Sequence, residues 1–314
     1  MHDAGRLQAP IIANTRSDRV RDVAKLAGRP ARLKRGQFLA EGPQAVREAL
    51  AAHRNRAPSG RVVVVQLFAT QECLNRFPEF DEPVSGVKLR LATDEVLAVM
   101  GDTVSSQGVI AVCNTIDVEL AEVLERRPRL IAVFSRMRDP GNAGAVLRAA
   151  DAAGADAVVI TASSVDIYNP KAVRSTAGSI FHLPVVVGED LGALTRRLNE
   201  SGLQLFAAHG YGNHDLDVLQ DECASRRLRR GDEDVPVSKH MGNRQGPKGP
   251  ALELPTAWIF GNEAQGLAET ELAMTDYSVS VPVYGTAESL NLATAATVCL
   301  YASARAQRNR RPAD

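Results

Sequence analysis

Four polar side chains stand close together in the last fifth of the sequence, where they could act on a ligand. Asn262 and Glu263 follow the apolar run 258–260, Ser289 precedes a long helical pattern, and Asn291 is expected inside the first turn of that helix. Helices and strands usually keep such residues on solvated faces, but here they crowd into the loops at strand ends. The loops at the carboxyl ends of strands are where open α/β sheets bind ligands. The sequence therefore predicts a site in this region.

A second candidate lies upstream, where the apolar run 130–134 is followed by the turn Asp-Pro-Gly at 139–141. We expect a helix from about residue 142 to 153, with Asn142 in the turn before it and Arg148 on its second turn. The glycine spacing does not match Gly-x-Gly-x-x-Gly, and no Gly-Lys-Ser/Thr follows a strand. Dinucleotide and P-loop sites are therefore disfavoured. A metal site is not expected either, because scattered histidines such as His209 and His214 are more often polar surface than ligands.

The length and composition indicate a globular protein with two domains. The chain has 314 residues, 45% of them hydrophobic, and a formal net charge of zero. Its charge is unevenly distributed, because residues 1–35 hold nine Lys or Arg against three acids. Such a segment suits a phosphate backbone, but it can equally be a solvated helix face.

The cysteines and the N-terminus indicate a cytoplasmic protein. Cys73, Cys113, Cys223 and Cys299 show no Cys-x-x-Cys spacing and are expected to be reduced core thiols. The N-terminus lacks an apolar signal segment. The apolar runs fall far short of about 20 residues, so no membrane span is expected.

Strand and helix patterns alternate along the chain, which predicts an α/β class. We expect a first domain at 1–116, a linker at 117–129 and a second domain at 130–314 that opens with a βαβ unit. A helix capped by Ser17 should end near Gly28 and Pro30. The pattern breaks down at 209–255, where residues 224–250 hold seven basic residues and three acids. This segment should be a flexible insertion, either an RNA-contacting arm or a loop without a role.

Three motifs resemble those of the SpoU/TrmH branch of the SPOUT RNA methyltransferases. They are Asn-x-Gly at 142–144 with Arg148 six residues after the Asn, Gly-x-Glu-x-x-Gly-Leu at 261–267, and Val-Pro-Val-x-Gly with Ser-Leu-Asn at 281–291. They occur in the family's order over about residues 129–305. Ala264 and Val283 stand where the family usually has Gly and Met, and neither should carry chemistry.

The resemblance implies a fold and partners that the residues alone do not establish. The C-terminal domain would be a SPOUT α/β domain with a trefoil knot, although knots are rare in proteins. Residues 35–50 look like the L30e-like three-layer α/β domain that binds RNA in many SpoU enzymes. The implied cofactor is S-adenosylmethionine, and the implied assembly is a homodimer whose site spans the subunit interface.

The resemblance also implies roles for particular residues. The catalytic set is Asn142, Arg148, Glu263, Ser289 and Asn291. The cofactor-binding set is Ile259, Gly261, Val281, Pro282, Leu290 and Ala295. From the residues alone, Glu263 could be only an acid near a helix start, and Ser289 could be only the N-cap of the helix through Ala304.

Arg148 is the family's catalytic residue by analogy. Deprotonating an ordinary guanidinium near pH 7 costs about 7 kcal/mol. We therefore favour electrostatic stabilisation of a developing alkoxide and of an RNA phosphate over action as a base.

The predicted function is an S-adenosylmethionine-dependent RNA 2′-O-ribose methyltransferase, with large-subunit (23S) rRNA as the expected substrate. The alternatives are a tRNA 2′-O-methyltransferase and a non-catalytic RNA-binding ribosome-assembly factor, and titration with S-adenosylmethionine would separate the factor from the enzymes. The sequence does not name the modified nucleotide or any link to antibiotic resistance.

Overall fold

The computed structural model describes residues 10–55, 62–103, 106–231 and 249–308, and for 229–231 only the backbone. The chain forms two compact units. The first unit comprises Met1–Asp117 and Asp166–Pro184, and the second unit comprises Val118–Val165 and Val185–Asp314.

The first unit is built on a mixed four-stranded sheet. Its order is β1 (Gln37–Glu41), β4 (Val109–Asn114), β2 (Val64–Ala69) and β3 (Lys88–Leu91). Only the β2–β3 pair is parallel. These strands form where apolar and β-branched residues fill the sheet's buried positions.

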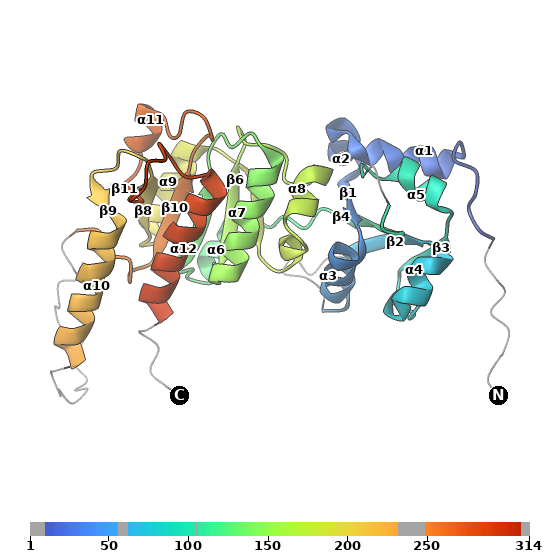
Figure 1. The fold of residues 1–314 in the computed structure, drawn as a ribbon, viewed down its shortest axis with the longest axis horizontal. Helices are drawn as coiled ribbons and strands as arrows, with labels where there is room; N and C mark the ends of the chain where they lie inside the picture. The colour runs from blue at the N-terminus through green and yellow to red at the C-terminus, as the bar shows by residue number, and fades with distance from the viewer. Residues whose placement is uncertain (1–9, 56–61, 104–105, 232–248, 309–314) are drawn as a thin grey trace. The chain divides into compact units, whose positions relative to one another are not determined.

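Helices cover both faces of this sheet, which makes three layers (Figure 1). They are α1 (Asp18–Ala24), α2 (Arg29–Arg35) and α5 (Asp94–Met100) on one face and α3 (Pro43–Arg54) and α4 (Gln71–Arg76) on the other, with short 3-10 turns η1 (Lys25–Ala27) and η2 (Pro78–Phe80). Ser17 caps α1 as predicted. Pro30 does not end a helix but stands in the first turn of α2, where a missing N–H costs nothing.

The segment Asp166–Pro184 completes the first unit with α8 (Pro170–Ser175) and the 3-10 turn η3 (Ser179–Phe181). The guanidinium of Arg32, 3% exposed, pairs with Asp166 at 2.7 Å. Phe38 of β1 packs against Tyr168 and Phe181, with ring centroids 4.7 and 5.9 Å away. The predicted division of the chain at 117–129 did not include this return of the chain to the first unit.

The second unit contains a seven-stranded sheet in which all neighbouring strands are parallel. Its order is β7 (Val185–Glu189), β6 (Ala157–Thr161), β5 (Leu130–Phe134), β10 (Thr256–Phe260), β8 (Gln204–Ala208), β11 (Tyr277–Ser280) and β9 (His214–Asp215). The central strands are buried throughout. This is the pattern expected of a parallel sheet covered on both faces.

The two faces of this sheet are covered by different helices. Residues of α6 (Leu120–Glu125) and α9 (Leu191–Glu200) share one apolar cluster with Ile131, Val133 and Ile259. The long helices α7 (Pro140–Ala153) and α12 (Leu292–Arg308) run side by side (Figure 1). The indole N–H of Trp258 in β10 donates to Ser303 of α12 at 2.9 Å, which ties α12 to the opposite face.

Two segments differ from the prediction. The expected linker 117–129 contains α6, whose Leu120 and Val123 are buried in the second unit. The expected flexible insertion contains β9 and the helix α10 (Leu216–Gly231). Residues 232–248 of that insertion lie outside the described residues. The side chains of Leu216, Leu219 and Cys223 in α10 are buried. The segment was predicted to be flexible because its many charged residues outnumber the few that form this apolar face.

Candidate functional site

The candidate site is built on the loops that follow β5 and β10, two adjacent parallel strands. Phe134 and Phe260 stand opposite each other at the ends of these strands, and the amide of Ser135 donates to the carbonyl of Phe260 at 2.8 Å. The two motif-bearing loops therefore leave the sheet side by side. This is the strand-end position at which α/β sheets bind ligands.

Helix α7 begins two residues earlier than predicted. Asp139 is its N-cap, and its carboxylate accepts a hydrogen bond from the amide of Asn142 at 2.8 Å. Pro140 occupies the first helical position, where proline is favoured. Asn142 thus lies in the first turn of α7 and not, as predicted, in the preceding turn.

Asn291 is the N-cap of α12. Its side-chain oxygen accepts from the amides of Ala293 at 2.9 Å and Thr294 at 3.3 Å. The predictions that Ser289 caps this helix and that Asn291 lies inside its first turn were wrong. The side-chain NH₂ of Asn291 donates to the side-chain oxygen of Asn142 at 3.2 Å. The structure therefore brings together two of the five predicted catalytic residues from positions 149 apart in the chain.

Glu263 binds the connection between β5 and α7. Its carboxylate accepts from the amides of Arg138 at 3.2 Å and Asp139 at 3.0 Å. It does not belong to the first turn of a helix in its own segment, and its partners in the structure are the backbone amides just before α7, one of them that of the N-cap residue Asp139. Glu263 therefore holds in place the residues that immediately precede Asn142.

Gly261 opens a tight turn in which the backbones of Asn262 and Gly266 exchange two hydrogen bonds, of 3.0 and 2.8 Å. A Cβ at Gly261 would lie 2.4 Å from the carbonyl carbon of Gly266. Only glycine allows so close an approach of the two backbones. This turn, residues 261–266, is called the β10 turn below.

Arg148 and Ser289 are exposed. Neither side chain takes part in a hydrogen bond or ion pair with the residues that the structure describes. Arg148 lies in α7, six residues after Asn142, and Ser289 lies in the loop before α12. Their catalytic roles stay predictions.

The predicted cofactor residues differ in accessibility. Ile259 is fully buried in the core cluster, so its side chain is not available to a ligand. Val281, Pro282 and Ala295 are half-buried, and Leu290 is exposed. Residues 281–290 form no backbone-to-backbone hydrogen bond within the described chain. Free backbone groups next to small apolar side chains are what an adenosine held without charged partners requires, so residues 281–290 fit S-adenosylmethionine.

Sequence reasoning missed two residues of this region, Arg136 and Glu271. They form an ion pair with an N–O distance of 2.5 Å. Arg136 lies two residues after the end of β5, and Glu271 lies in α11 (Glu269–Leu272). Nothing in the local pattern of either segment signals a contact over 135 positions.

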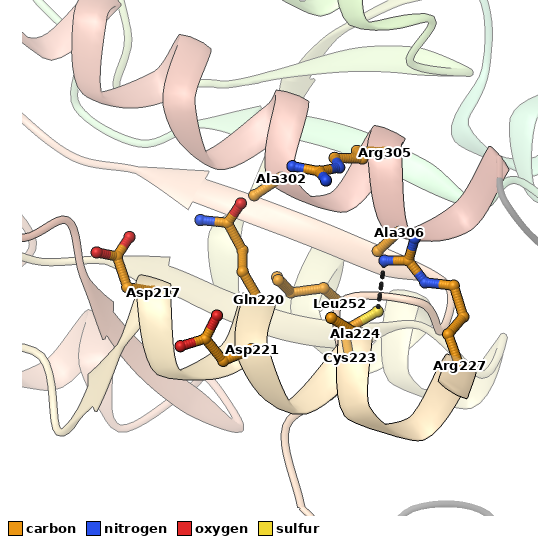
Figure 2. A pocket seen from close by; sticks show the side chains of 10 residues that line it. All are labelled: Asp217, Gln220, Asp221, Cys223, Ala224, Arg227, Leu252, Ala302, Arg305 and Ala306. Carbon is orange, nitrogen blue, oxygen red and sulfur yellow. Dashed lines mark hydrogen bonds between the residues drawn. The ribbon is translucent and has the colours of Figure 1, made fainter. Parts of the chain in front are cut away.

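A separate cavity of about 270 Å³ lies between α10 and α12 (Figure 2). Asp217 and Asp221 line it together with Arg227 and Arg305, and a guanidinium N–H of Arg227 faces the sulfur of Cys223 at 3.6 Å. None of the predicted site residues lines it.

All four cysteines are free and buried. The burial of Cys113 and Cys299 raises the pKa of each thiol.

Two searches of the described residues bear on other classes of site. None of the helices described is long and apolar enough to cross a membrane. No group of three or more His, Cys, Asp or Glu within the described ranges is arranged to hold a metal ion.

Comparison with known proteins connects these loops to a family. Residues 129–301 match the model of the SpoU rRNA Methylase family, and residues 17–111 match the MRM3-like substrate binding domain. The chain is 30% identical to the 23S rRNA (guanosine(2553)-2′-O)-methyltransferase RlmP of Bacillus subtilis (strain 168), over 92% of this chain and 97% of the relative. It is 28% identical to the 23S rRNA (uridine(2479)-2′-O)-methyltransferase of Streptomyces viridochromogenes, over 90% of this chain and 87% of the relative.

Solved structures agree with these matches. The SpoU methyltransferase AviRb from Streptomyces viridochromogenes, in complex with the cofactor AdoMet, is 26% identical with a TM-score of 0.69, and the alignment covers 95% of this chain and all of that one. The mixed α/β fold with two sheets is thus that of SpoU methyltransferases. The resemblance inferred from three motifs is confirmed, and the chain belongs to the SpoU rRNA methylase family.

Proposed function

We propose that this protein is an S-adenosylmethionine-dependent RNA 2′-O-ribose methyltransferase that acts on large-subunit rRNA. The observation that carries the proposal is the hydrogen bond between Asn142 and Asn291. It joins the starts of α7 and α12 next to the β10 turn, which is where the three motifs of a ribose methyltransferase must meet. The 23S rRNA 2′-O-methyltransferases among its relatives support the substrate class.

The cofactor would be held by the β10 turn and the backbone of 281–290, with Val281, Leu290 and Ala295 against its apolar parts. When bound, S-adenosylmethionine supplies a methyl group that moves to the ribose 2′ oxygen, as the O–C bond forms and the S–C bond breaks. The hydroxyl proton would pass to solvent water as the S–C bond breaks. The remaining task of the protein is to place the ribose and to stabilise the charge that develops on its oxygen.

Asn142 is suited to placing the ribose. The oxygen of Asn291 is used by the amides of α12, and the NH₂ of Asn291 is used by Asn142. The NH₂ of Asn142 has no partner within the described residues. The side-chain NH₂ of Asn142 is therefore the donor of the Asn142–Asn291 pair that can bind a ribose hydroxyl.

Arg148 is suited to stabilising charge. Its guanidinium is exposed on α7 and unpaired within the part of the chain that the structure describes. A planar guanidinium with five N–H donors binds phosphate and alkoxide oxygens well. We assign it electrostatic stabilisation of the 2′ oxygen and contact with an RNA phosphate, and not action as a base.

The acting form is proposed to be a homodimer. Val298 and Tyr301 of α12 are 38% and 49% exposed, and Arg305 and Thr294 continue the same helical stripe. Two exposed apolar side chains within this stripe, on a long helix next to the site, suit contact with a second copy of this chain. A cytoplasmic location and the trefoil knot of the family remain part of the same proposal.

The test is methyl transfer to RNA in vitro. Purified protein, methyl-labelled S-adenosylmethionine and large-subunit rRNA lacking the modification should yield one labelled 2′-O-methyl nucleotide. Arg148→Lys should fold normally and lose at least about 100-fold in rate. Arg126→Lys, at an exposed position just after α6, is the matched control and should keep the parental rate. Methylation of tRNA only, or binding of RNA without cofactor binding, would contradict the proposal.

A further inference from the structure

Arg136 adopts a backbone conformation that non-glycine residues rarely occupy. Its φ is 52°, in the left-handed region, and it stands two residues after the end of β5. Such a conformation is strained in a non-glycine residue and persists only where surrounding contacts fix it. Strong contacts are therefore expected to hold Arg136 in this conformation.

The guanidinium of Arg136 binds both oxygens of Glu271. Its Nε donates to Oε1 at 2.9 Å and its NH2 to Oε2 at 2.5 Å. Bidentate pairs of this kind are the strong and directional ones. NH2 also lies 3.4 Å from the carbonyl oxygen of Gly266, and the backbone oxygen of Arg136 accepts from the side-chain NH₂ of Asn262 at 3.2 Å. One residue thus holds both ends of the β10 turn.

The surroundings of Glu271 keep its carboxyl group ionised for the pair with Arg136. Its carboxyl group is 8% exposed and also accepts from the hydroxyl of Ser135 at 2.5 Å and from the amide of Ala268 at 2.7 Å. Burial alone would raise the pKa of Glu271. The hydrogen bonds from Arg136, Ser135 and Ala268 outweigh burial and hold that pKa below its ordinary value. The group is therefore a carboxylate at neutral pH.

The two loops hold each other in both directions. Arg136, in the β5–α7 connection, binds Asn262 and Gly266 of the β10 turn. Glu263, in the β10 turn, binds the amides of Arg138 and Asp139 in the β5–α7 connection. The shape of the β10 turn and the position of the α7 start are thus set by a closed ring of contacts.

We propose that Arg136 is a positioning residue which, through its bidentate pair with Glu271, fixes the β10 turn in the shape that binds the cofactor. This inference rests on the proposed function, because the turn binds a cofactor only if the protein is a methyltransferase. Arg136 itself need not touch the cofactor or the RNA. Its loss should therefore weaken cofactor binding and leave the rate at saturating cofactor nearly unchanged.

The experiment uses Arg136→Gly and a matched control. Glycine accepts the positive φ without strain, so the variant removes the guanidinium without disturbing the backbone. Arg127→Gly is the control, because Arg127 has a φ of 53°, is exposed, and lies in the same unit just after α6. Three quantities are measured on the full chain: the dissociation constant for S-adenosylmethionine by calorimetry, amide hydrogen exchange of residues 262–266, and kcat for methyl transfer at saturating cofactor.

Arg136→Gly should raise the dissociation constant about tenfold and speed exchange in the β10 turn, with kcat within about twofold of the parent. Arg127→Gly should change neither. Arg136→Lys should recover only part of the affinity, because an ammonium cannot form the bidentate pair. Should Arg136→Gly fold poorly, Glu271→Gln, which keeps the shape of the side chain and removes its charge, should give the same two effects.

Unchanged affinity and unchanged exchange in a folded Arg136→Gly or Glu271→Gln protein would overturn the inference. A parental protein that binds no S-adenosylmethionine would instead overturn the proposed function. Exchange in the turn is measured without cofactor, so the two failures are distinguishable.

Discussion

The side-chain NH₂ of Asn291 donates to the side-chain oxygen of Asn142 across 3.2 Å, while the oxygen of Asn291 caps α12. One side chain thus begins a helix and orients a second side chain at the start of another helix. The two roles use different atoms, so they can be separated by substitution.

Asn291→Ser should separate them. Serine is as good an N-cap as asparagine, so the free energy of unfolding should change by less than about 0.5 kcal/mol. Serine is too short to reach Asn142, so methylation should fall at least about tenfold. Urea unfolding and a methyl-transfer assay measure the two effects. Parental activity in this variant would show that the Asn142 contact is dispensable.

Asn142→Asp should remove the donor that we assign to the ribose. A carboxylate can still accept from Asn291, and an acid in the first turn of α7 interacts favourably with the helix dipole. Stability near pH 7 should therefore be kept or slightly raised, while kcat/KM for RNA falls. Thermal unfolding and steady-state kinetics measure this. A variant with full kcat/KM would contradict the assignment.

Gly261→Ala should disrupt the β10 turn. The new Cβ would meet the backbone of Gly266 at 2.4 Å, and backbone atoms cannot move aside as a flexible side chain can. We expect a loss of about 1–3 kcal/mol in unfolding free energy and loss of S-adenosylmethionine binding. Gly210→Ala is the control, because nothing lies within 4 Å of a Cβ there. Equal stability of the two variants would refute this account of the turn.

Arg226→Ala should leave a buried charge without its partner. Arg226 donates to both oxygens of Glu253, which is 4% exposed. Burial raises the pKa of Glu253, but the bonds from Arg226 and from its own backbone hold it below its ordinary value. Removing Arg226 should cost about 3 kcal/mol near pH 7. Arg21→Ala, which breaks the exposed pair with Asp18, should cost less than about 1 kcal/mol.

The difference in unfolding free energy between the parent and Arg226→Ala should depend on pH with a definite sign. A carboxyl group with a lowered folded pKa stabilises the protein above its unfolded pKa, and this stabilisation is lost as pH falls through the folded value. Without Arg226, burial raises the folded pKa of Glu253, and protonation relieves the penalty. The gap between parent and Arg226→Ala should thus be widest near pH 7 and should shrink in acid. A difference in unfolding free energy that grows as pH falls would contradict this account of the Arg226–Glu253 pair.

The regular elements could be predicted from the sequence because their signals are local. The strand β5 was placed at its observed bounds, and α7 within two residues of its start, from apolar runs and turn residues alone. Ser289 and Asn291 are both good N-cap residues two positions apart. The choice between them follows from contacts in the folded unit, including the one that Asn291 makes with Asn142, which no local pattern contains.

Other features depend on contacts between distant residues. Arg136 and Glu271 are 135 positions apart, and Arg32 and Asp166 are 134 apart. Arg226 is one of the basic residues of the segment that was predicted to be flexible, either as an RNA-contacting arm or as a loop without a role, but its guanidinium is paired with Glu253 and Glu222. A charged helix such as α10 is therefore hard to tell from a flexible segment until its partners are known.

The return of Asp166–Pro184 to the first unit affects how the protein is made. Ribosomes deliver the chain from the N-terminus, so Phe38 lacks Tyr168 and Phe181, and Arg32 lacks its ion pair with Asp166, until residues 166–181 have emerged. By then β5, α7 and β6 have been synthesised as well. The N-terminal domain therefore cannot finish folding before much of the methyltransferase domain exists, and a fragment that stops at Asp117 would lack part of its own core.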